Sequence, residues 1–278
     1  MYWIDGATLD ASRAPFDLAD RGLTLGDGLF DTALALNGRV FRKEAHLARL
    51  EDGLALLGID APIARARACM DALEAHGARH SLRVTVTRGA GLRGLNPLGA
   101  QKPVVFGALT PYAAAPFPRL RLHLAPIRRN ETSPASRVKA LSYLDAILAM
   151  REAAAAGFDD ALFLNGAGRV ACAGVGNVFA LFGDELATPP LDDGVLPGIM
   201  RALVLEQAPA LGLVPRARSF GLDELLRADA AFMTNSLRLV APIDAVGGTR
   251  LPERGRATLD ALQALSRRLV EAECGAPL

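Results

Sequence analysis

One lysine of this chain is placed where its amine could do chemistry. Only three lysines occur against a large excess of arginine, and Lys43 (in Arg42-Lys43-Glu44) and Lys102 (beside Pro103) are expected to be solvated. Lys139 is set between apolar neighbours shortly before an amphipathic helix. An amine held in such surroundings can act as a nucleophile and proton carrier. The residues alone leave a second interpretation open, in which the stem of Lys139 packs and its ammonium group extends to solvent.

Three further stretches carry residue types suited to a ligand. The small residues of 172–177 would let a backbone approach a ligand closely, although a tight turn explains the glycines equally well. In the glycine-rich loop 88–97, the guanidinium groups of Arg88 and Arg93 could clamp a carboxylate, and a solvated surface loop remains the alternative. The segment 196–201 should begin a helix with proline and glycine, which leaves backbone N–H groups that can seat a phosphate.

Six separated motifs are similar to those of one enzyme family. They are Arg21–Phe30, His46–Leu50, Lys139–Leu144, Gly174–Phe179, Leu196–Arg201 and Thr234–Ser236. On these motifs, which follow the family's order over almost the whole chain, the sequence resembles the class IV aminotransferases, the fold-type IV enzymes that use pyridoxal phosphate. The family includes branched-chain aminotransferases, D-amino acid aminotransferases and 4-amino-4-deoxychorismate lyases.

The resemblance implies a fold, a cofactor and a set of site residues. It implies an α+β, two-domain fold-type IV enzyme with a cofactor cleft between the domains. Lys139 is then the catalytic residue, to which pyridoxal 5'-phosphate is attached and which carries the reacting proton. The other implied cofactor-binding residues are Arg49, Tyr143, Cys172, Gly176, Asn177, Gly198, Ile199, Met200, Thr234, Asn235 and Ser236. Phe30, Arg88 and Arg93 are the expected substrate-binding residues, His46 is expected to be structural support, and no metal is expected.

Position 172 departs from the family pattern. Family members usually have a glutamate five residues before the asparagine of Asn-Val-Phe, and its carboxylate keeps the pyridine nitrogen protonated, which makes the ring a strong electron sink. This chain has Cys172 at that position, and a neutral thiol supplies no such charge. Transamination relies on that sink, whereas an elimination that forms an aromatic ring asks less of it.

We therefore expect a pyridoxal phosphate-dependent lyase that converts 4-amino-4-deoxychorismate to 4-aminobenzoate and pyruvate. The loop Arg88–Gly94 and the Thr-Asn-Ser-Leu segment at Thr234–Leu237 also favour the lyases. One alternative is an aminotransferase for D-amino acids or branched-chain amino acids. A second alternative is a family member that binds the cofactor, or a partner protein, without turnover.

Composition narrows the partners and the compartment. A formal net charge of +1 gives no electrostatic case for nucleic acid or a membrane surface, so a small amino substrate is expected. The three cysteines are sparse and lack metal spacing, which fits a reducing cytoplasm. Neither a signal peptide nor a long apolar run is evident. A homodimer is expected from the family resemblance only.

Patterning predicts a mixed fold with a boundary near residue 113. Three prolines in 111–118 indicate a stiff linker, so we expect a smaller N-terminal α/β domain (1–112), a linker (113–118) and a larger C-terminal cofactor-binding domain (119–278). The expected strands are 2–4, 29–36, 39–41, 82–87, 103–109, 120–125, 160–164 and 230–234, and the expected helices are 44–57, 62–76, one after Lys139, one from about 197 to 208, and 254–272. Antiparallel pairing is expected in the first third because its turns are short.

Three local patterns add detail to these elements. Asn37-Gly38 is a strong hairpin signal between the strands 29–36 and 39–41. The leucines of the helix 44–57 recur at helical spacing and predict its buried face. In the helix after Lys139, a buried stripe is expected at the apolar residues Tyr143, Leu144, Ile147, Leu148 and Ala155.

Overall fold

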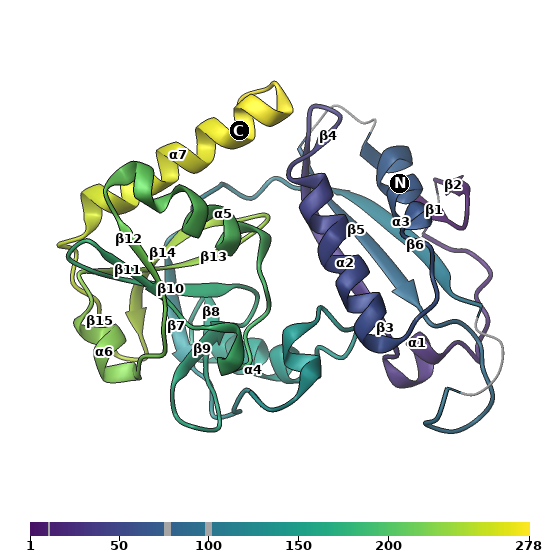
Figure 1. The fold of residues 1–278 in the computed structure, drawn as a ribbon, viewed down its shortest axis with the longest axis horizontal. Helices are drawn as coiled ribbons and strands as arrows, with labels where there is room; N and C mark the ends of the chain where they lie inside the picture. The colour runs from purple at the N-terminus through teal and green to yellow at the C-terminus, as the bar shows by residue number, and fades with distance from the viewer. Residues whose placement is uncertain (11, 75–78, 98–101) are drawn as a thin grey trace. The chain divides into compact units, whose positions relative to one another are not determined.

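The computed structural model describes residues 1–10, 12–74, 79–97 and 102–278, and the chain divides into two compact units (Figure 1). The first unit consists of Met1–Ala114, Val138–Ser142 and Val270–Leu278, and the second of Ala115–Arg137 and Tyr143–Leu269. Both combine helices with a β-sheet, as the α+β prediction requires. Within the described ranges, no helix is long and apolar enough to cross a membrane.

The first unit is built on a six-stranded sheet with the order β2-β1-β6-β5-β3-β4. Its elements are β1 (Tyr2–Ile4), β2 (Ala7–Leu9), α1 (Arg21–Leu25), β3 (Gly28–Leu36), β4 (Arg39–Val40), α2 (Lys43–Leu57), α3 (Ile63–Glu74), β5 (His80–Thr87) and β6 (Val104–Pro111). Every pairing in this sheet is antiparallel, which confirms the expectation from the short turns. The predicted end of the second helix at residue 76 lies outside the described residues.

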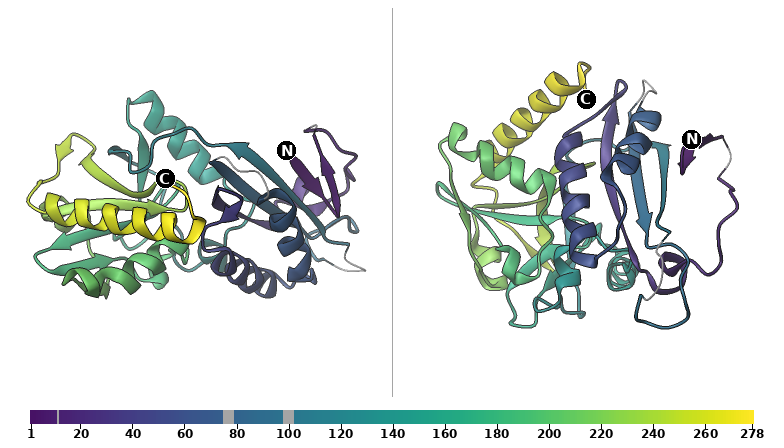
Figure 2. Two further views of the ribbon diagram at one scale, coloured as in Figure 1. Left: turned by 90° about the horizontal axis from the view of Figure 1, so that it is seen from above. Right: turned by 45° about the vertical axis from the view of Figure 1, so that its right-hand side comes forward.

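Helices α2 and α3 cover one face of this sheet (Figure 2). The leucines of α2 recur at helical spacing, and Leu47, Leu50 and Leu54 pack on the same core as Leu82 and Val84 of β5. Because side chains alternate along a strand, the residues between these core positions belong to the opposite face. One face of β3 and β5 therefore packs against the helices. The opposite face carries Phe30 and Arg83, which are described below.

The second unit is built on a nine-stranded sheet with the order β12-β11-β10-β13-β14-β7-β8-β9, and β15 pairs with β14. Its strands are β7 (Leu120–Leu124), β8 (Asp160–Leu164), β9 (Val170–Ala173), β10 (Asn177–Phe182), β11 (Glu185–Thr188), β12 (Val214–Ala217), β13 (Ala230–Asn235), β14 (Leu239–Val246) and β15 (Thr249–Arg250). Its helices are α4 (Leu144–Ala155), α5 (Ile199–Gln207), α6 (Leu222–Arg227) and α7 (Arg256–Cys274, whose last turn is counted with the first unit), with short 3₁₀ turns at Pro134–Arg137, Leu191–Asp193 and Ala208–Leu211.

Both faces of the central strands of this second sheet are buried. Phe179 of β10 stacks on Phe232 of β13, with ring centroids 4.9 Å apart, in a core shared with α5 and α7. The alternate residues Val178 and Met233 belong to a separate core that includes Leu225 of α6. Burial on both faces explains why these strands read as continuous apolar runs in the sequence.

The buried stripe predicted for α4 is wrong. Leu144 and Ile147, which were expected in the core, are 64% and 59% exposed. The helix instead packs through Ala149 and Ala153 against Ala161 and its neighbours. Small alanine side chains let the helix lie close to the sheet, so its larger residues are turned outward.

Candidate active site

Lys139 lies in a turn directly before Ala140, which forms a bridge with Leu29, so the backbone of this segment is fixed against β3. The main-chain N–H of Phe30 donates to the carbonyl oxygen of Lys139 at 2.9 Å, and the N–H of Leu141 donates to the carbonyl of Gly28 at 3.0 Å. These bonds place the Lys139 side chain beside the Phe30 ring, with Nζ 4.2 Å from the ring centroid. An amine carried on a fixed backbone and resting on an apolar ring is positioned rather than mobile, as a catalytic amine requires.

Arg83 is a second cation at the Phe30 ring, and the sequence analysis missed it. Its guanidinium carbon lies 3.7 Å from the ring centroid, and the residue is exposed. The signal was present in the strand alternation, because Arg83 stands between the core residues Leu82 and Val84 and so belongs to the opposite face of β5. Phe30, Lys139 and Arg83 therefore form one cluster in which a substrate carboxylate would find a planar donor.

Arg49 and His46 converge on a buried carboxylate, Asp31 of β3. Arg49 donates to it through Nε at 3.0 Å and Nη2 at 2.8 Å, and His46 Nδ1 lies 2.7 Å from Oδ1. Burial by itself raises the pKa of Asp31, but the charges of Arg49 and His46 outweigh it and hold that pKa well below its usual range. The planar fork of Arg49 is thus held in one orientation. Its contact with the cofactor phosphate stays a prediction.

The two arginines expected to bind substrate lie in different surroundings. Arg88 is buried, and its three guanidinium nitrogens donate to Asp27 and to the carbonyl oxygens of Leu57 and Gly58, at 2.7–2.8 Å. These bonds hold the end of α2, so Arg88 has a structural role in this chain. Arg93 is exposed. We carry Arg93 and Arg83 into the proposed substrate site.

In the second unit, the predicted phosphate-binding residues gather around the start of α5. Asn177 pairs with Thr234 across β10 and β13, and its side-chain Nδ2 donates to the carbonyl of Leu196 at 2.9 Å. The Asn177 side chain lies so close to Gly198 that a β-carbon at Gly198 would collide with it. Gly176 is similarly confined, since a β-carbon there would collide with the Met233 side chain. The glycines at both positions are therefore required by packing.

The α5 terminus has the donors that a phosphate monoester needs. Gly198 occupies the N-cap position in an extended conformation, and no side chain caps the amides that follow, those of Ile199 and Met200. Among the described residues, the hydroxyl of Thr234 is buried and has no hydrogen-bond partner. A buried, unpaired hydroxyl beside uncapped amides fits the phosphate of the cofactor, because such a group normally has a partner.

The neighbouring Asn235 and Ser236 shape the turn after β13. Asn235 Oδ1 accepts from the amides of Leu237 at 3.0 Å and Arg238 at 2.7 Å, and its Nδ2 donates to the carbonyl of Val175 at 3.2 Å. Ser236 is half-buried within this turn. The Asn235 side chain is thus used to build the turn and to tie it to the loop before Asn177.

Asp160 binds both the loop before Asn177 and the turn after β13, and this role was not recognised in the sequence. Its Oδ1 accepts from the amide of Gly174 at 3.0 Å, and its Oδ2 pairs with Arg238 Nη1 at 2.7 Å. Burial raises the pKa of Asp160, although Arg238 opposes the rise. No local pattern marks this role, because the partners are 14 and 78 residues away.

Cys172 lies on strand β9 and pairs with Phe163 of β8 and with Asn177 of β10. Burial raises the pKa of its thiol, and the nearby Arg129 guanidinium opposes this only in part. The thiol is therefore neutral at neutral pH and cannot act as an anionic partner. Tyr143 occupies the N-cap position of α4 and is half-buried.

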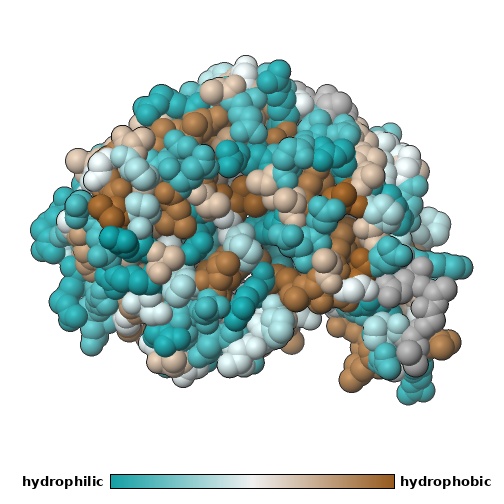
Figure 3. Space-filling view, in the orientation of Figure 1, coloured by the Kyte–Doolittle hydropathy of each residue, from teal (hydrophilic) through white to brown (hydrophobic). Residues whose placement is uncertain are grey.

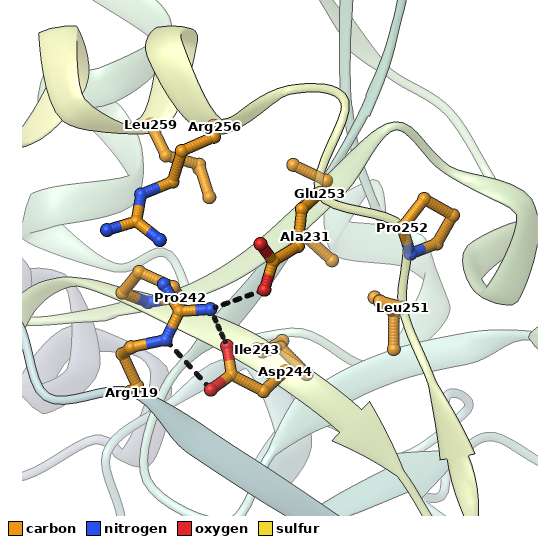
Figure 4. Close-up of a pocket in the computed structure, with 11 residues that line it drawn as sticks. Arg119, Ala231, Pro242, Ile243, Asp244, Leu251, Pro252, Glu253, Arg256 and Leu259 are labelled. Carbon is orange, nitrogen blue, oxygen red and sulfur yellow. Dashed lines mark hydrogen bonds and ion pairs between the residues drawn. The ribbon is translucent and has the colours of Figure 1, made fainter.

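A separate pocket of the second unit contains none of the predicted site residues (Figure 4). Its lining includes Arg119, Asp244 and Glu253, and Arg119 pairs with both carboxylates at 2.6–3.3 Å. Arg256 pairs with Asp260, so the charged groups at the pocket are engaged in ion pairs. The candidate residues are therefore the two groups described above, one in each unit.

Comparison with known proteins identifies the family. The family model "Amino-transferase class IV" matches residues 28–246. The chain belongs to the class IV aminotransferase family. Enzymes of this family use pyridoxal phosphate, and this protein is accordingly a pyridoxal phosphate-dependent enzyme.

The relatives carry several activities in their names. The chain is 31% identical over 259 residues to the Methanocaldococcus jannaschii protein named "Putative branched-chain-amino-acid aminotransferase", with 88% of each chain covered. It is 27% identical over 278 residues to the aminodeoxychorismate lyase of Bacillus subtilis, covering 98% of this chain and 95% of the relative. The branched-chain aminotransferase of Thermoproteus uzoniensis superposes with a TM-score of 0.89 at 27% identity, covering 98% of this chain and 95% of that one. The fold-type IV prediction is thereby confirmed, and the reaction is not decided by likeness.

Proposed function

We propose that this class IV enzyme is a lyase that converts 4-amino-4-deoxychorismate to 4-aminobenzoate and pyruvate. The observation that carries the proposal is the half-buried, neutral thiol of Cys172 at the position where the family usually has a carboxylate. Without that carboxylate, the cofactor ring is a weaker electron sink, and reactions that depend fully on it are disfavoured. Formation of an aromatic product supplies driving force that a transamination lacks.

Lys139 performs the proton transfers in this scheme. Bound pyridoxal phosphate supplies an electron sink at the amino-bearing carbon of the substrate. The Lys139 amine removes the proton from that ring carbon, the bond from the neighbouring ring carbon to the enolpyruvyl oxygen breaks, and the ring becomes aromatic. Lys139 returns the proton to the departing enolpyruvyl methylene carbon, which yields pyruvate. Atoms balance without water, oxidant or reductant.

Arg83 and Arg93 are the proposed partners of the two substrate carboxylates. Arg83 of β5 lies at the ring of Phe30 on the adjacent strand β3, as Lys139 does, so a carboxylate bound to Arg83 would stand close to the reacting amine. Phe30 offers an apolar surface for the substrate ring, and its buried position keeps water from that side.

A product assay tests the proposal. The holoenzyme is supplied with 4-amino-4-deoxychorismate, and in parallel with D- and L-amino acids plus 2-oxoglutarate. We expect equimolar 4-aminobenzoate and pyruvate from the first mixture, at a rate well above any transamination. Robust transamination with little 4-aminobenzoate would refute the assignment.

An aminotransferase for branched-chain or D-amino acids is the second candidate. It is favoured by the similarity to a branched-chain aminotransferase over nearly the whole chain at a TM-score of 0.89. Under this alternative, the amino acid panel gives the faster turnover. A third outcome, cofactor binding without turnover on any substrate, would mark a family member that has lost activity.

We also propose that the protein acts as a cytoplasmic homodimer. The first unit exposes Leu23 and Leu25 of α1, Leu18 shortly before α1, and Leu92 and Leu95 in the loop after β5, each at 46–83%. Hydrophobic residues are visible on the part of the surface where α1 lies (Figure 3). Arg21 joins α1 to the loop by donating to the carbonyl oxygens of Gly94 and Leu95 at 2.7 and 2.8 Å, and we call the exposed leucines of these neighbouring segments the leucine surface.

A second copy of the chain is the proposed occupant of this leucine surface, because a net charge near zero leaves little repulsion between copies. The three cysteines, none in a disulfide, support a reducing compartment. Sedimentation of the parent as a dimer, and of a Leu92→Ser, Leu95→Ser double variant as a monomer, would support the interface. An unchanged dimer in the variant would place the interface elsewhere.

A further inference from the structure

Arg201 is a buried arginine for which the described residues provide no carboxylate. Its side chain belongs to a residue that is 8% exposed, its Nη2 donates to the carbonyl of Pro189 at 3.0 Å, and its Nε is buried without a partner. Two other arginines of the same unit that contact a buried acid are themselves more exposed, Arg238 at 25% paired with Asp160 and Arg169 at 42% paired with Asp193, both at 2.7 Å. A buried cation left without a counter-charge is costly, so this one should have a function.

Arg201 stands in the first turn of α5, three residues after the N-cap Gly198. Helical side chains lean toward the N-terminus of their helix, so its charge adds to the positive end of the helix dipole. Burial lowers the pKa of Arg201, and no neighbouring carboxylate offsets that effect. The electrostatic potential at this terminus is therefore positive and uncompensated by the described residues.

Thr234 supplies an independent sign that a ligand belongs here. It is 1% exposed, and its hydroxyl has no partner in the described part of the chain. Thr234 pairs with Asn177 on the adjacent strand, and the Asn177 side chain packs directly on Gly198. Two unpaired donors, one neutral and one charged, thus lie around the same uncapped helix terminus.

We propose that Arg201 is the charge-compensating residue of an anion site at the start of α5, and that the anion is the phosphate monoester of the cofactor. The inference rests on the proposed function only in taking pyridoxal phosphate as the ligand. Arg201 acts through the charge it adds behind the helix terminus, while the Thr234 hydroxyl donates to the anion. The buried charge is balanced only when the anion is bound, so the same residue that strengthens cofactor binding weakens the empty protein.

Loss of the Arg201 charge should therefore weaken cofactor binding without destabilising the cofactor-free protein. These two opposite effects distinguish the proposal from a merely structural role of Arg201. Replacing Arg201 with methionine removes the charge and keeps a long apolar stem. We expect Arg201→Met to weaken pyridoxal phosphate binding about tenfold or more, as loss of an interaction with a charged group does, while the melting temperature of the cofactor-free protein stays equal or rises. Arg201→Lys keeps the charge and should retain most of the affinity.

The ligands and controls identify the source of the effect. Pyridoxal lacks the phosphate, so its affinity should be the same in Arg201→Met and the parent, while inorganic phosphate should compete with pyridoxal phosphate less well in the variant. Thr234→Val should likewise weaken pyridoxal phosphate and spare pyridoxal. Arg216→Met removes the same charge from an exposed site of this unit and should change neither affinity nor stability.

Three results would overturn the proposal. They are unchanged affinity for pyridoxal phosphate in Arg201→Met, equal loss for pyridoxal and pyridoxal phosphate, and a cofactor-free Arg201→Met that melts lower or does not fold. These experiments measure cofactor affinity and protein stability, so a failure of this proposal is distinguishable from a failure of the lyase assignment. A parent protein that binds pyridoxal phosphate tightly and releases no 4-aminobenzoate would refute that assignment and leave this inference standing.

Discussion

Removing the charge of Asp31 should destabilise the protein more than any surface ion pair could. The carboxylate is 1% exposed, accepts from Arg49 and lies 2.7 Å from His46 Nδ1, so Asp31→Asn removes the charge opposite a guanidinium whose side chain is only 11% exposed. Breaking a buried pair by removing one partner typically costs about 3–5 kcal/mol. A native domain is stable by about 5–15 kcal/mol, so the loss is a large share of the total.

Urea unfolding of the cofactor-free protein measures this loss. Asp244→Asn is the matched control, because Asp244 pairs with Arg119 on the surface, where both side chains are a third or more exposed. Such an exposed pair contributes about 0–1 kcal/mol. We expect Asp31→Asn to lower the free energy of unfolding by about 3 kcal/mol and the control by less than about 1 kcal/mol.

The pH dependence of the free energy of unfolding tests independently whether the ionised Asp31 stabilises the folded protein. The pKa of Asp31 is lowered in the folded protein, so its ionised form contributes stability that is present above the ordinary value of 3.8 and is lost as the pH falls below it. The difference in stability between the parent and Asp31→Asn should therefore be constant near neutral pH and shrink in acid below about pH 3.8. A difference that grows in acid would contradict this reasoning.

Replacing both Asp31 and Arg49 measures how much of the lost stability comes from the Arg49 charge that Asp31→Asn leaves without a partner. In the double variant Asp31→Asn, Arg49→Met, no buried charge is left unpaired between these two positions, so part of the stability should return. If Asp31→Asn alone costs less than about 1 kcal/mol, the carboxylate does not hold Arg49 in place, and the orientation argued for that guanidinium is refuted.

Three further predictions concern the cofactor residues. Arg49→Ala should weaken cofactor retention about ten- to a hundred-fold, and Arg93→Ala much less, since only the first is a predicted phosphate contact; equal affinity in Arg49→Ala and the parent would remove it from the site. Gly198→Ala should weaken cofactor binding because its β-carbon would collide with a side chain of β10. Gly221→Ala is the control, since a β-carbon there meets open space and should not change binding. Tight cofactor binding by Gly198→Ala would count against a phosphate site at the start of α5. Cys172→Glu should accelerate single-turnover release of keto acid from an amino acid, because a carboxylate would strengthen the electron sink; an unchanged rate with the cofactor still bound would undercut the lyase argument.

The regular elements of the first unit were accessible from the sequence. Asn37-Gly38 predicted a tight hairpin, and both residues have positive φ, 52° and 71°, with Ala35 opposite Val40. The leucine spacing of α2 predicted its buried face. In these segments local turn chemistry and periodicity agree with the tertiary packing, so short-range reasoning suffices.

The buried face of α4 could not be predicted from the spacing of its apolar residues. The apolar residues of α4 gave a helix correctly but the wrong face, because Ala149 and Ala153 allow a closer approach to β8 than Leu144 or Ile147 would. A pattern of apolar positions cannot tell which of two apolar faces meets the sheet.

The site residues divide in a similar way. The positions of Asn177 and Gly198 came from motif resemblance, and the structure brings them into contact. The lack of a counter-charge at Arg201 and of a partner for the Thr234 hydroxyl could not be predicted, since an unpaired atom is defined by everything around it in space. Only the folded chain shows which donors are left for a ligand.

The central claim is that Lys139 is the reacting amine, and borohydride reduction tests it most directly. Reduction fixes the carbonyl carbon of pyridoxal phosphate permanently onto the amine that holds it, and peptide mapping then locates the label. We expect the label on Lys139 alone, because Lys43 is paired with Asp71 and Glu74, which raise its pKa against the effect of burial, and Lys102 is exposed. A label on Lys43 or Lys102, or on no peptide of a protein that retains the cofactor, would contradict the account.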